Sequence, residues 1–161
     1  VAEYRAALDL LWSRPGAAAR QAFLVGHDYG AMYGILTAAA DERVRGLVLM
    51  APVSQFWKWN RILRPIRDKD NMKRYQALLS PYDPVSLIGE LNIPILFQYA
   101  KRDQYVEEKD AVALYDAAEQ AKKTLVWYGG SHALNRHEPA TLDREQWIQN
   151  LIAEWESDTI R

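Results

Sequence analysis

Three residues whose side chains could act together in catalysis follow predicted strands. Asp28 is the central residue of the pentapeptide Gly26–Gly30 (Gly-His-Asp-Tyr-Gly), Asp103 follows the third predicted strand and His132 follows the fourth. A carboxylate can act as a nucleophile, an imidazole can take a proton from water, and a second carboxylate can hold the imidazole in one tautomer. These residue types therefore predict a catalytic triad of Asp28, Asp103 and His132. The alternative is that Asp103 is a turn residue and His132 an ordinary strand-end histidine.

The elements that must position these residues alternate between helices and strands. Apolar runs predict the strands, and three-to-four-residue periods predict the helices. The expected order is helix 4–12, strand 22–25, helix 29–40, strand 44–50, strand 93–100, helix 109–121, strand 124–128 and helix 142–155. This order is typical of an α/β fold with an open, mostly parallel sheet of about four strands flanked by helices. Because the carboxyl ends of parallel strands share one edge of a sheet, the three side chains are expected to converge there.

The pentapeptide is predicted to be a sharp turn from a strand into a helix. The central residue of such a turn has a strained backbone, so small residues are expected two positions away, and Gly26 and Gly30 meet this requirement. The helix start would also place the backbone N–H of Tyr29 where it stabilises negative charge, which provides half of an oxyanion hole. The alternative is an ordinary turn in which Asp28 only caps the helix.

Together these motifs resemble the α/β-hydrolase family, from its fifth strand to its last helix, over essentially the whole chain. The turn resembles the family's nucleophile elbow, and the chain order of nucleophile, acid and histidine is that of the family. The segments 99–106 (Tyr-Ala-Lys-Arg-Asp-Gln-Tyr-Val) and 130–135 (Gly-Ser-His-Ala-Leu-Asn) are most similar to its dienelactone-hydrolase-like group. The resemblance implies a partial domain over 1–161, without the first four strands and without the loop that contributes the second oxyanion N–H.

An aspartate at position 28 implies a reaction on saturated carbon. The carboxylate would form an alkyl-enzyme ester, and water activated by His132 would then cleave that ester. Haloalkane dehalogenases, fluoroacetate dehalogenases and epoxide hydrolases resemble this elbow, although most of them carry Trp where Tyr29 stands. The dienelactone-like group normally has Cys or Ser at the elbow, and Asp cannot form the usual acyl-enzyme with an ester, so the two resemblances imply different substrates: a carbon–halogen or epoxide bond, or an ester. We therefore expect a hydrolase of small organic molecules that needs no cofactor; the alternative is a non-catalytic binding domain of the same fold with a substituted nucleophile.

The segment from about 55 to 91 interrupts the alternation and is predicted to form a small lid of short helices. It contains Phe56, Trp57 and Trp59, of which at least one is expected to line an apolar pocket over the triad. Trp57 is the residue assigned to this substrate pocket, together with Tyr29. The alternative is that these rings only pack the lid against the sheet.

No metal site is expected from the sequence. The chain has no Cys, and His27 is expected to pack beside the turn as a structural residue. His137 and Glu138 are expected in a solvated loop, because residues adjacent in sequence do not face each other on a helix. Asp110 is expected on the solvated face of its helix, outside the site.

The composition excludes several kinds of partner. The net charge of -1 and a pI near 6.3 give no reason to expect nucleic acid or an anionic membrane. Every apolar run is shorter than the roughly 20 residues that span a bilayer, and the lack of Cys suits a reducing compartment, so the cytoplasm is expected. The abrupt start at Val1 predicts a missing N-terminal half, or a homodimer across the edge of strand 22–25.

Overall fold

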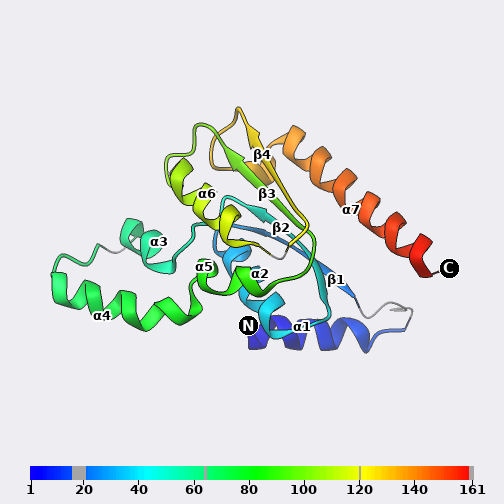
Figure 1. Cartoon of the computed structure of the whole chain (residues 1–161), viewed down its shortest axis with the longest axis horizontal. Coiled ribbons are helices and arrows are strands. Elements are labelled where there is room, and N and C mark those ends of the chain that lie inside the picture. The colour runs from blue at the N-terminus through cyan, green and yellow to red at the C-terminus, as the bar shows by residue number, and fades with distance from the viewer. Residues whose placement is uncertain (16–20, 64, 120, 160–161) are drawn as a thin grey trace.

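The computed structural model describes residues 1–15, 21–63, 65–119 and 121–159. Within them, four parallel strands form one open sheet with helices on both faces (Figure 1). The strands are hydrogen-bonded in chain order: β1 (Ala22–His27), β2 (Val44–Met50), β3 (Ile95–Ala100) and β4 (Lys123–Tyr128). The predicted α/β class and the open parallel sheet are confirmed.

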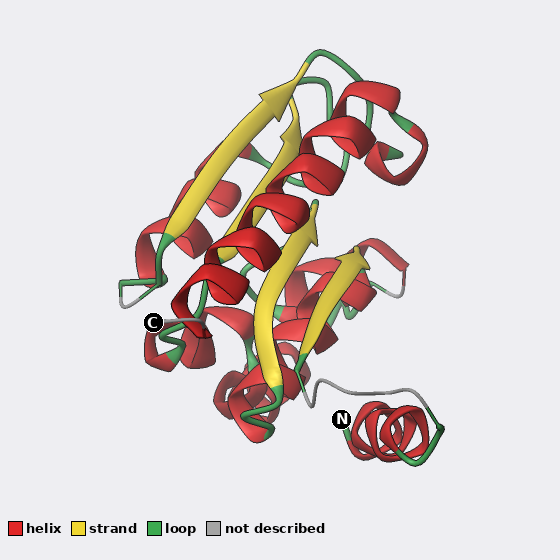
Figure 2. Cartoon of the chain, turned by 90° about the vertical axis from the view of Figure 1, so that its right-hand side faces the viewer, coloured by secondary structure: helices red, strands yellow, loops and turns green. Residues whose placement is uncertain are grey.

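Helices cover both faces of the sheet. The helix α7 (Glu138–Thr159) crosses one face, in front of the strands in Figure 2. The other face is covered mainly by α2 (Tyr29–Ala40) and α6 (Glu108–Ala117), and α1 (Ala2–Trp12) lies near the start of β1. None of the described helices is long and apolar enough to cross a membrane.

The two central strands are apolar on both faces because helices cover both faces. Every residue of β3 is buried, and in β2 only Arg45 is exposed. In β1 the ring of Phe23 stacks on Trp155 of α7, with the ring centroids 4.9 Å apart. The core therefore lies between the sheet and its helices and holds the carboxyl ends of the strands in a fixed register.

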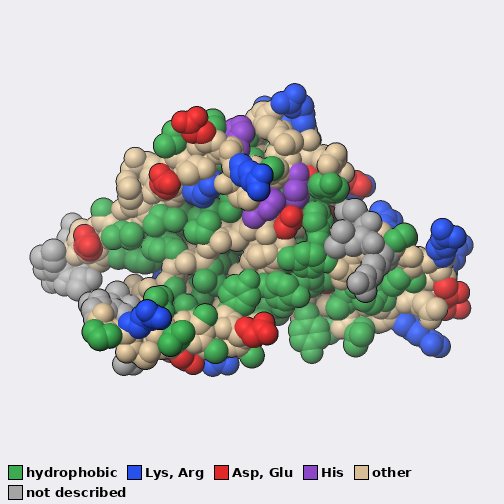
Figure 3. Space-filling view, turned by 180° about the vertical axis from the view of Figure 1, so that it is seen from behind, with side chains coloured by type: hydrophobic (Ala, Val, Ile, Leu, Met, Phe, Trp, Pro, Cys, Tyr) green, Lys and Arg blue, Asp and Glu red, His purple; other side chains and the backbone are tan. Residues whose placement is uncertain are grey.

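Strand β1 lies at the edge of the described sheet. It pairs with β2, and no strand of the described residues pairs with its other side. Val25 in this strand is 49% exposed, and Figure 3 shows a wide area of hydrophobic side chains beneath the histidines on this face of the molecule. That a missing half or a second copy covers this edge remains the prediction made from the sequence.

The helix bounds differ from the expected ones where local chemistry outweighs periodicity. The terminal helix begins at Glu138 rather than 142, because Pro139 lies in its first turn, where a helix needs no backbone N–H from it. The helix α6 ends at Ala117 rather than 121, because Ala118 leaves the helical conformation with ψ 61. Both differences lie at element ends and leave the topology unchanged.

The segment predicted as a lid contains short helices. They are α3 (Phe56–Leu63), α4 (Lys69–Leu79), η1 (Ser80–Tyr82), α5 (Pro84–Leu87) and η2 (Ile88–Glu90). In Figure 1, α3 and α4 extend away from the sheet, and α5 lies beside α2. That the segment acts as a lid stays a prediction.

One acidic residue anchors this segment, and the expectation that it is solvated is wrong. The side chain of Asp110 is only 6% exposed, and its carboxylate accepts hydrogen bonds from the backbone N–H of Ser54 (3.3 Å), from the Ser54 hydroxyl and from the Lys58 ammonium. The start of α6 faces the loop after β2, which the helical period could not reveal. Asp110 thereby ties α3 to the sheet.

Candidate active site

Asp28 alone makes the turn between β1 and α2. Its backbone has φ 59 and ψ -124, a combination that non-glycine residues rarely adopt and that costs conformational energy. The Asp28 N–H donates to the carbonyl oxygen of Met50 (3.0 Å), and its own carbonyl accepts from the N–H groups of Ala31 and Met32 (3.1 Å each). These bonds hold the strained backbone, and its side chain lies at the carboxyl end of β1.

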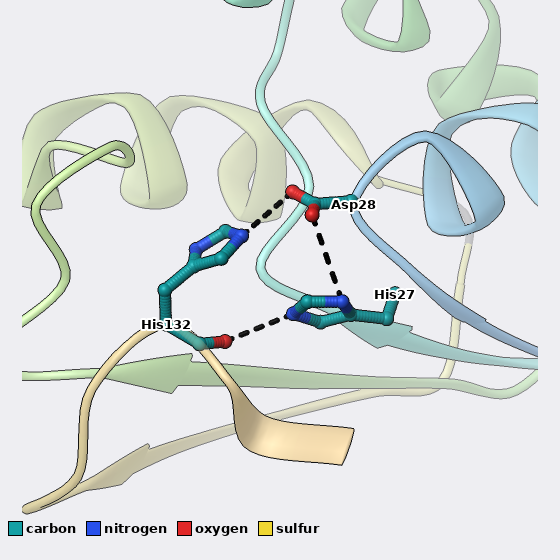
Figure 4. A group of neighbouring side chains, drawn as sticks. All are labelled: His27, Asp28 and His132. Atoms are coloured by element: carbon teal, nitrogen blue, oxygen red, sulfur yellow. Dashed lines mark hydrogen bonds and ion pairs between the residues drawn. The ribbon is translucent and has the colours of Figure 1, made fainter. Parts of the chain in front are cut away.

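The structure brings the three predicted side chains together. His132 Nε2 lies 2.8 Å from Asp28 Oδ1, and His132 Nδ1 lies 2.7 Å from Asp103 Oδ2. Figure 4 shows the Asp28 and His132 side chains pointing toward each other. The side chains of Asp28, His132 and Asp103 are 25%, 12% and 2% exposed, so solvent reaches the Asp28 carboxylate while the Asp103 carboxylate is buried. His132 thus links the accessible carboxylate of Asp28 to the buried carboxylate of Asp103 through two hydrogen bonds.

The buried carboxylate has a fixed orientation. Asp103 Oδ1 accepts hydrogen bonds from the backbone N–H groups of Tyr105 (2.8 Å) and Val106 (3.0 Å). Burial raises the pKa of Asp103, but the bond from His132 and these backbone bonds outweigh it and lower the pKa overall. Asp103 is therefore ionised at neutral pH and accepts a hydrogen bond from the Nδ1–H of His132.

The two carboxylates strongly favour the charged form of His132. Burial lowers the pKa of this imidazole, but the hydrogen bonds and charges of Asp103 and Asp28 outweigh burial and raise the pKa to about 9. In the resting site the imidazole is therefore mainly protonated. It becomes a base when one of the two negative charges is removed.

Aromatic rings enclose the imidazole. The ring of Trp59 stacks on that of His132 at 5.5 Å between centroids, and the edge of Tyr105 contacts it at 4.9 Å. On another side His27 lies at 4.8 Å, and its Nε2 is 2.9 Å from the carbonyl oxygen of His132. The rings limit the directions in which the imidazole can move.

The two tryptophans of α3 have different surroundings. Trp59 contacts His132, whereas Trp57 lies under the Arg61 guanidinium (5.7 Å) and lines a neighbouring groove of about 400 Å³ with Lys58 and other residues. Residues two apart on a helix point to nearly opposite sides, so only one of them can face the site. Trp57 is the ring that the sequence predicts for the substrate pocket. The spacing keeps Trp57 and Trp59 off a common face of α3, and the packing of α3 directs Trp59 to His132.

The side chain of Tyr29 faces a cavity between α2 and the lid segment. Its hydroxyl donates to the side-chain oxygen of Asn60, whose amide in turn donates to Tyr75. Burial raises the pKa of Tyr29, and the nearby Tyr75, Tyr33 and Asp28 raise it further. The cavity measures about 510 Å³ and is lined by Tyr29, Tyr33, Leu36, Phe56, Asn60, Leu79 and Tyr82. Tyr29 therefore follows Asp28 directly in the chain and also lines the cavity with its side chain.

The two glycines of the turn have different requirements. A Cβ on Gly26 would lie 2.4 Å from the backbone of Gly30 and from the N atom of Ala31, whereas a Cβ on Gly30 would meet no described atom within 4 Å. The expectation of a small residue therefore holds at Gly26. At Gly30 the neighbouring elements leave room for a Cβ, so they do not require a glycine there.

This difference gives a matched pair of substitutions. We expect Gly26→Ala to lower the free energy of unfolding by about 3 kcal/mol or more, because the backbone of α2 must move away from β1. Gly30→Ala is expected to change it by less than about 1 kcal/mol, in the stabilising direction, because alanine favours helix over glycine. Urea unfolding of both variants measures this. Equal stabilities for the two variants would contradict the tight packing at Gly26.

The chain is similar to a known protein family and to several solved structures. The model of the Alpha/beta hydrolase family matches residues 1–159. Among solved structures, the esterase domain of a Rhodothermus marinus protein is 19% identical with a TM-score of 0.67, covering 95% of this chain and 66% of that one. An esterase from Pyrococcus furiosus is 13% identical with a TM-score of 0.67, and the match covers 92% of this chain and 58% of that one. Dipeptidyl peptidase 4 of Porphyromonas gingivalis is 12% identical with a TM-score of 0.72, and the match covers 92% of this chain and 22% of that one.

The similarity to these structures is one of fold. At these identities it extends to the arrangement of the elements, and the chain spans two thirds or less of the length of each of them. No curated protein matched the sequence significantly. The family match over nearly the whole chain and the four-stranded parallel sheet agree, and the chain belongs to the alpha/beta hydrolase family.

Proposed function

We propose that this chain carries the catalytic residues of a hydrolase that cleaves small organic molecules with Asp28 as nucleophile. One observation carries the proposal: the accessible Asp28 carboxylate is hydrogen-bonded at 2.8 Å to a histidine that is itself bonded to the buried Asp103. If Asp28 were only a helix cap, its side chain would accept N–H groups of α2, and it accepts none. The side chain is instead directed to the histidine, which supports a chemical role.

The first step is an attack on saturated carbon. An Asp28 oxygen forms a bond to the substrate carbon while the bond from that carbon to a halogen, or to an epoxide oxygen, breaks, and the leaving atom takes the electron pair. A carboxylate nucleophile, unlike a hydroxyl or a thiol, needs no general base to activate it. Attack on an ester carbonyl would give a tetrahedral intermediate from which the carboxylate leaves more readily than an alkoxide, so the attack would reverse. Alkyl halides and epoxides are therefore better substrates for this nucleophile than esters.

The second step is hydrolysis of the Asp28 ester. Water adds to the ester carbonyl carbon, His132 Nε2 takes the water proton, and the N–H of Tyr29 stabilises the oxyanion. The imidazolium then returns a proton to the leaving oxygen and the alcohol departs. Asp28 regains its carboxylate, with one oxygen from water, as its acid proton passes to His132. Esterification removes one negative charge beside His132, so the pKa of the imidazole falls from its resting value of about 9. The histidine thus becomes a base at the step that needs one.

The cavity beside the turn indicates the class of substrate. Its volume of about 510 Å³ lies in the range of small-molecule sites, and rings and aliphatic side chains form most of its wall. Its polar groups come from tyrosine hydroxyls and Asn60, without a Lys or Arg among the lining residues. We therefore assign it to an uncharged, largely apolar molecule that reaches Asp28 past Tyr29.

The origin of the product oxygen tests the mechanism. The protein in its full natural length is screened for hydrolysis of haloalkanes, epoxides and aryl esters, and any substrate found is turned over in heavy-oxygen water. We expect the heavy isotope in the peptide that contains Asp28, and unlabelled oxygen in the alcohol of the first turnover. Label in the alcohol and none in Asp28 would refute the carboxylate nucleophile. A folded protein that hydrolyses no compound of the panel would favour the non-catalytic binding domain.

A further inference from the structure

A histidine that the proposed reaction does not use points at the nucleophile. His27 Nδ1 lies 3.6 Å from Asp28 Oδ2, and His132 Nε2 lies 2.8 Å from Asp28 Oδ1 (Figure 4). One ligand atom from each of the three residues lies within 4.8 Å of the others. Two imidazole nitrogens and one carboxylate oxygen are a ligand set that divalent transition metals bind in proteins.

Each of the two histidines has its second ring nitrogen bonded as in metal sites. His27 Nε2 lies 2.9 Å from the carbonyl oxygen of His132, which can only accept, so Nε2 carries the hydrogen and Nδ1 keeps its lone pair. His132 Nδ1 is bonded to Asp103 at 2.7 Å, and a metal ion would displace the proton from Nε2, which then becomes the ligand atom. Metal-ligating histidines almost always donate their other N–H to a carbonyl or carboxylate in this way. The two ring nitrogens, His27 Nδ1 and His132 Nε2, therefore both face the Asp28 carboxylate, each at a different oxygen.

The charge and access of this cluster suit a cation. The Asp28 and Asp103 carboxylates contribute two negative charges, in the described part of the chain neither is paired with Lys or Arg, and both act on the ion once it has displaced the His132 proton. The side chains of His27, Asp28 and His132 are 21%, 25% and 12% exposed, so an ion and a water molecule can reach them. Metal–ligand bonds of about 2.1 Å place tetrahedral ligand atoms about 3.4 Å apart. The 3.6 Å separation of His27 and Asp28 is close to this, and small side-chain rotations would adjust the other two.

We propose that His27, Asp28 and His132 bind one divalent transition-metal ion, of which Zn²⁺ is the probe, with water completing its coordination. Binding itself does not depend on the hydrolase activity. A second consequence rests on the proposed function: a metal ion that holds the Asp28 carboxylate and His132 Nε2 prevents alkylation, so the ion acts as a reversible inhibitor.

Direct binding of zinc tests the site without any substrate. Chelator-treated protein of full natural length, freed of the chelator, is titrated with Zn²⁺ by calorimetry and equilibrium dialysis, and we expect one ion per chain. In His27→Gln the amide can still donate to the His132 carbonyl, but the Nδ1 lone pair is lost, so affinity should fall at least about tenfold. His137→Gln is the matched control, because the ring of His137 packs on Tyr128 and lies outside the cluster. Its affinity should equal that of the wild type.

Two results would overturn the metal site. One is a folded wild type without stoichiometric zinc binding, and the other is equal zinc affinity in the wild type and His27→Gln. If His27→Gln does not fold, histidine NMR of the wild type decides, because zinc should shift the ring signals of His27 and His132 and leave His137 unchanged. Zinc binding by a protein that forms no Asp28 ester with any substrate would refute the hydrolase alone. An Asp28 ester with turnover that is insensitive to bound zinc would refute the inhibition alone.

Discussion

His132→Gln is expected to accumulate an ester on Asp28 with any substrate that the wild type turns over. The attack by Asp28 needs no base, so the first step persists, whereas the water that cleaves the ester loses the Nε2 acceptor. General-base catalysis contributes about 10²–10⁴-fold, and steady-state turnover should fall by that factor. Intact mass should increase by the mass of one substrate fragment, and peptide mapping should place it on Asp28.

The control for this experiment removes the nucleophile. The double variant Asp28→Asn with His132→Gln keeps the size of side chain 28 but not its carboxylate, and it should gain no mass under the same conditions. An adduct on the double variant would show that another residue reacts. His132→Gln with wild-type turnover, or with an adduct elsewhere in the chain, would contradict the assigned roles.

Asp103→Asn is expected to slow the hydrolysis of the ester by about 10²–10⁴-fold while leaving the alkylation of Asp28 nearly unchanged. Asp103 accepts the Nδ1–H of His132 at 2.7 Å, which places the lone pair of the neutral ring on Nε2. An asparagine amide donates to Nδ1 instead and stabilises the tautomer whose Nε2 cannot accept a proton. The asparagine oxygen still accepts the N–H groups of Tyr105 and Val106, so the turn should persist.

Rapid-mixing kinetics separate the two steps. The variant should release the leaving group in a burst of one equivalent and then turn over slowly. Asp143→Asn is the matched control, because that carboxylate accepts from the Tyr128 hydroxyl (2.8 Å) and has no contact with His132. It should keep wild-type kinetics. Equal slowing of both steps by Asp103→Asn would show that Asp103 acts on the whole pocket rather than through His132.

The described fold and the membership of the three-residue site could be predicted from local patterns. Strand β2 was expected over 44–50 and spans Val44–Met50, because a strand buried on both faces is a continuous apolar run. The sequence predicts a site of three residues, each of which follows a predicted strand: Asp28, Asp103 and His132. Parallel strands place their carboxyl ends at one edge of the sheet, so these residues are expected to meet there. The distances of 2.8 and 2.7 Å among their side chains fit that expectation, and their catalytic roles stay a prediction.

The surroundings of the site required the tertiary structure. Whether Trp57 or Trp59 faces the histidine depends on how α3 rotates against the sheet, and the burial of Asp110 depends on Ser54, which lies far from it in the chain. A helical period shows which residues share a face but not what that face meets. His27 is expected from the sequence to pack beside the turn as a structural residue, and the sequence does not show its contact with His132, which lies 105 positions away.

The sequence by itself thus determined the order and type of the elements and the chemistry available at three of their ends. Periodicity and turn residues act within a few positions of the chain, so they are visible in the sequence. Which side chains surround those ends was decided by the packing of distant segments, since side-chain contacts depend on helix rotation and strand register. The convergence of two histidine nitrogens on one carboxylate is such a contact, and only the assembled sheet reveals it.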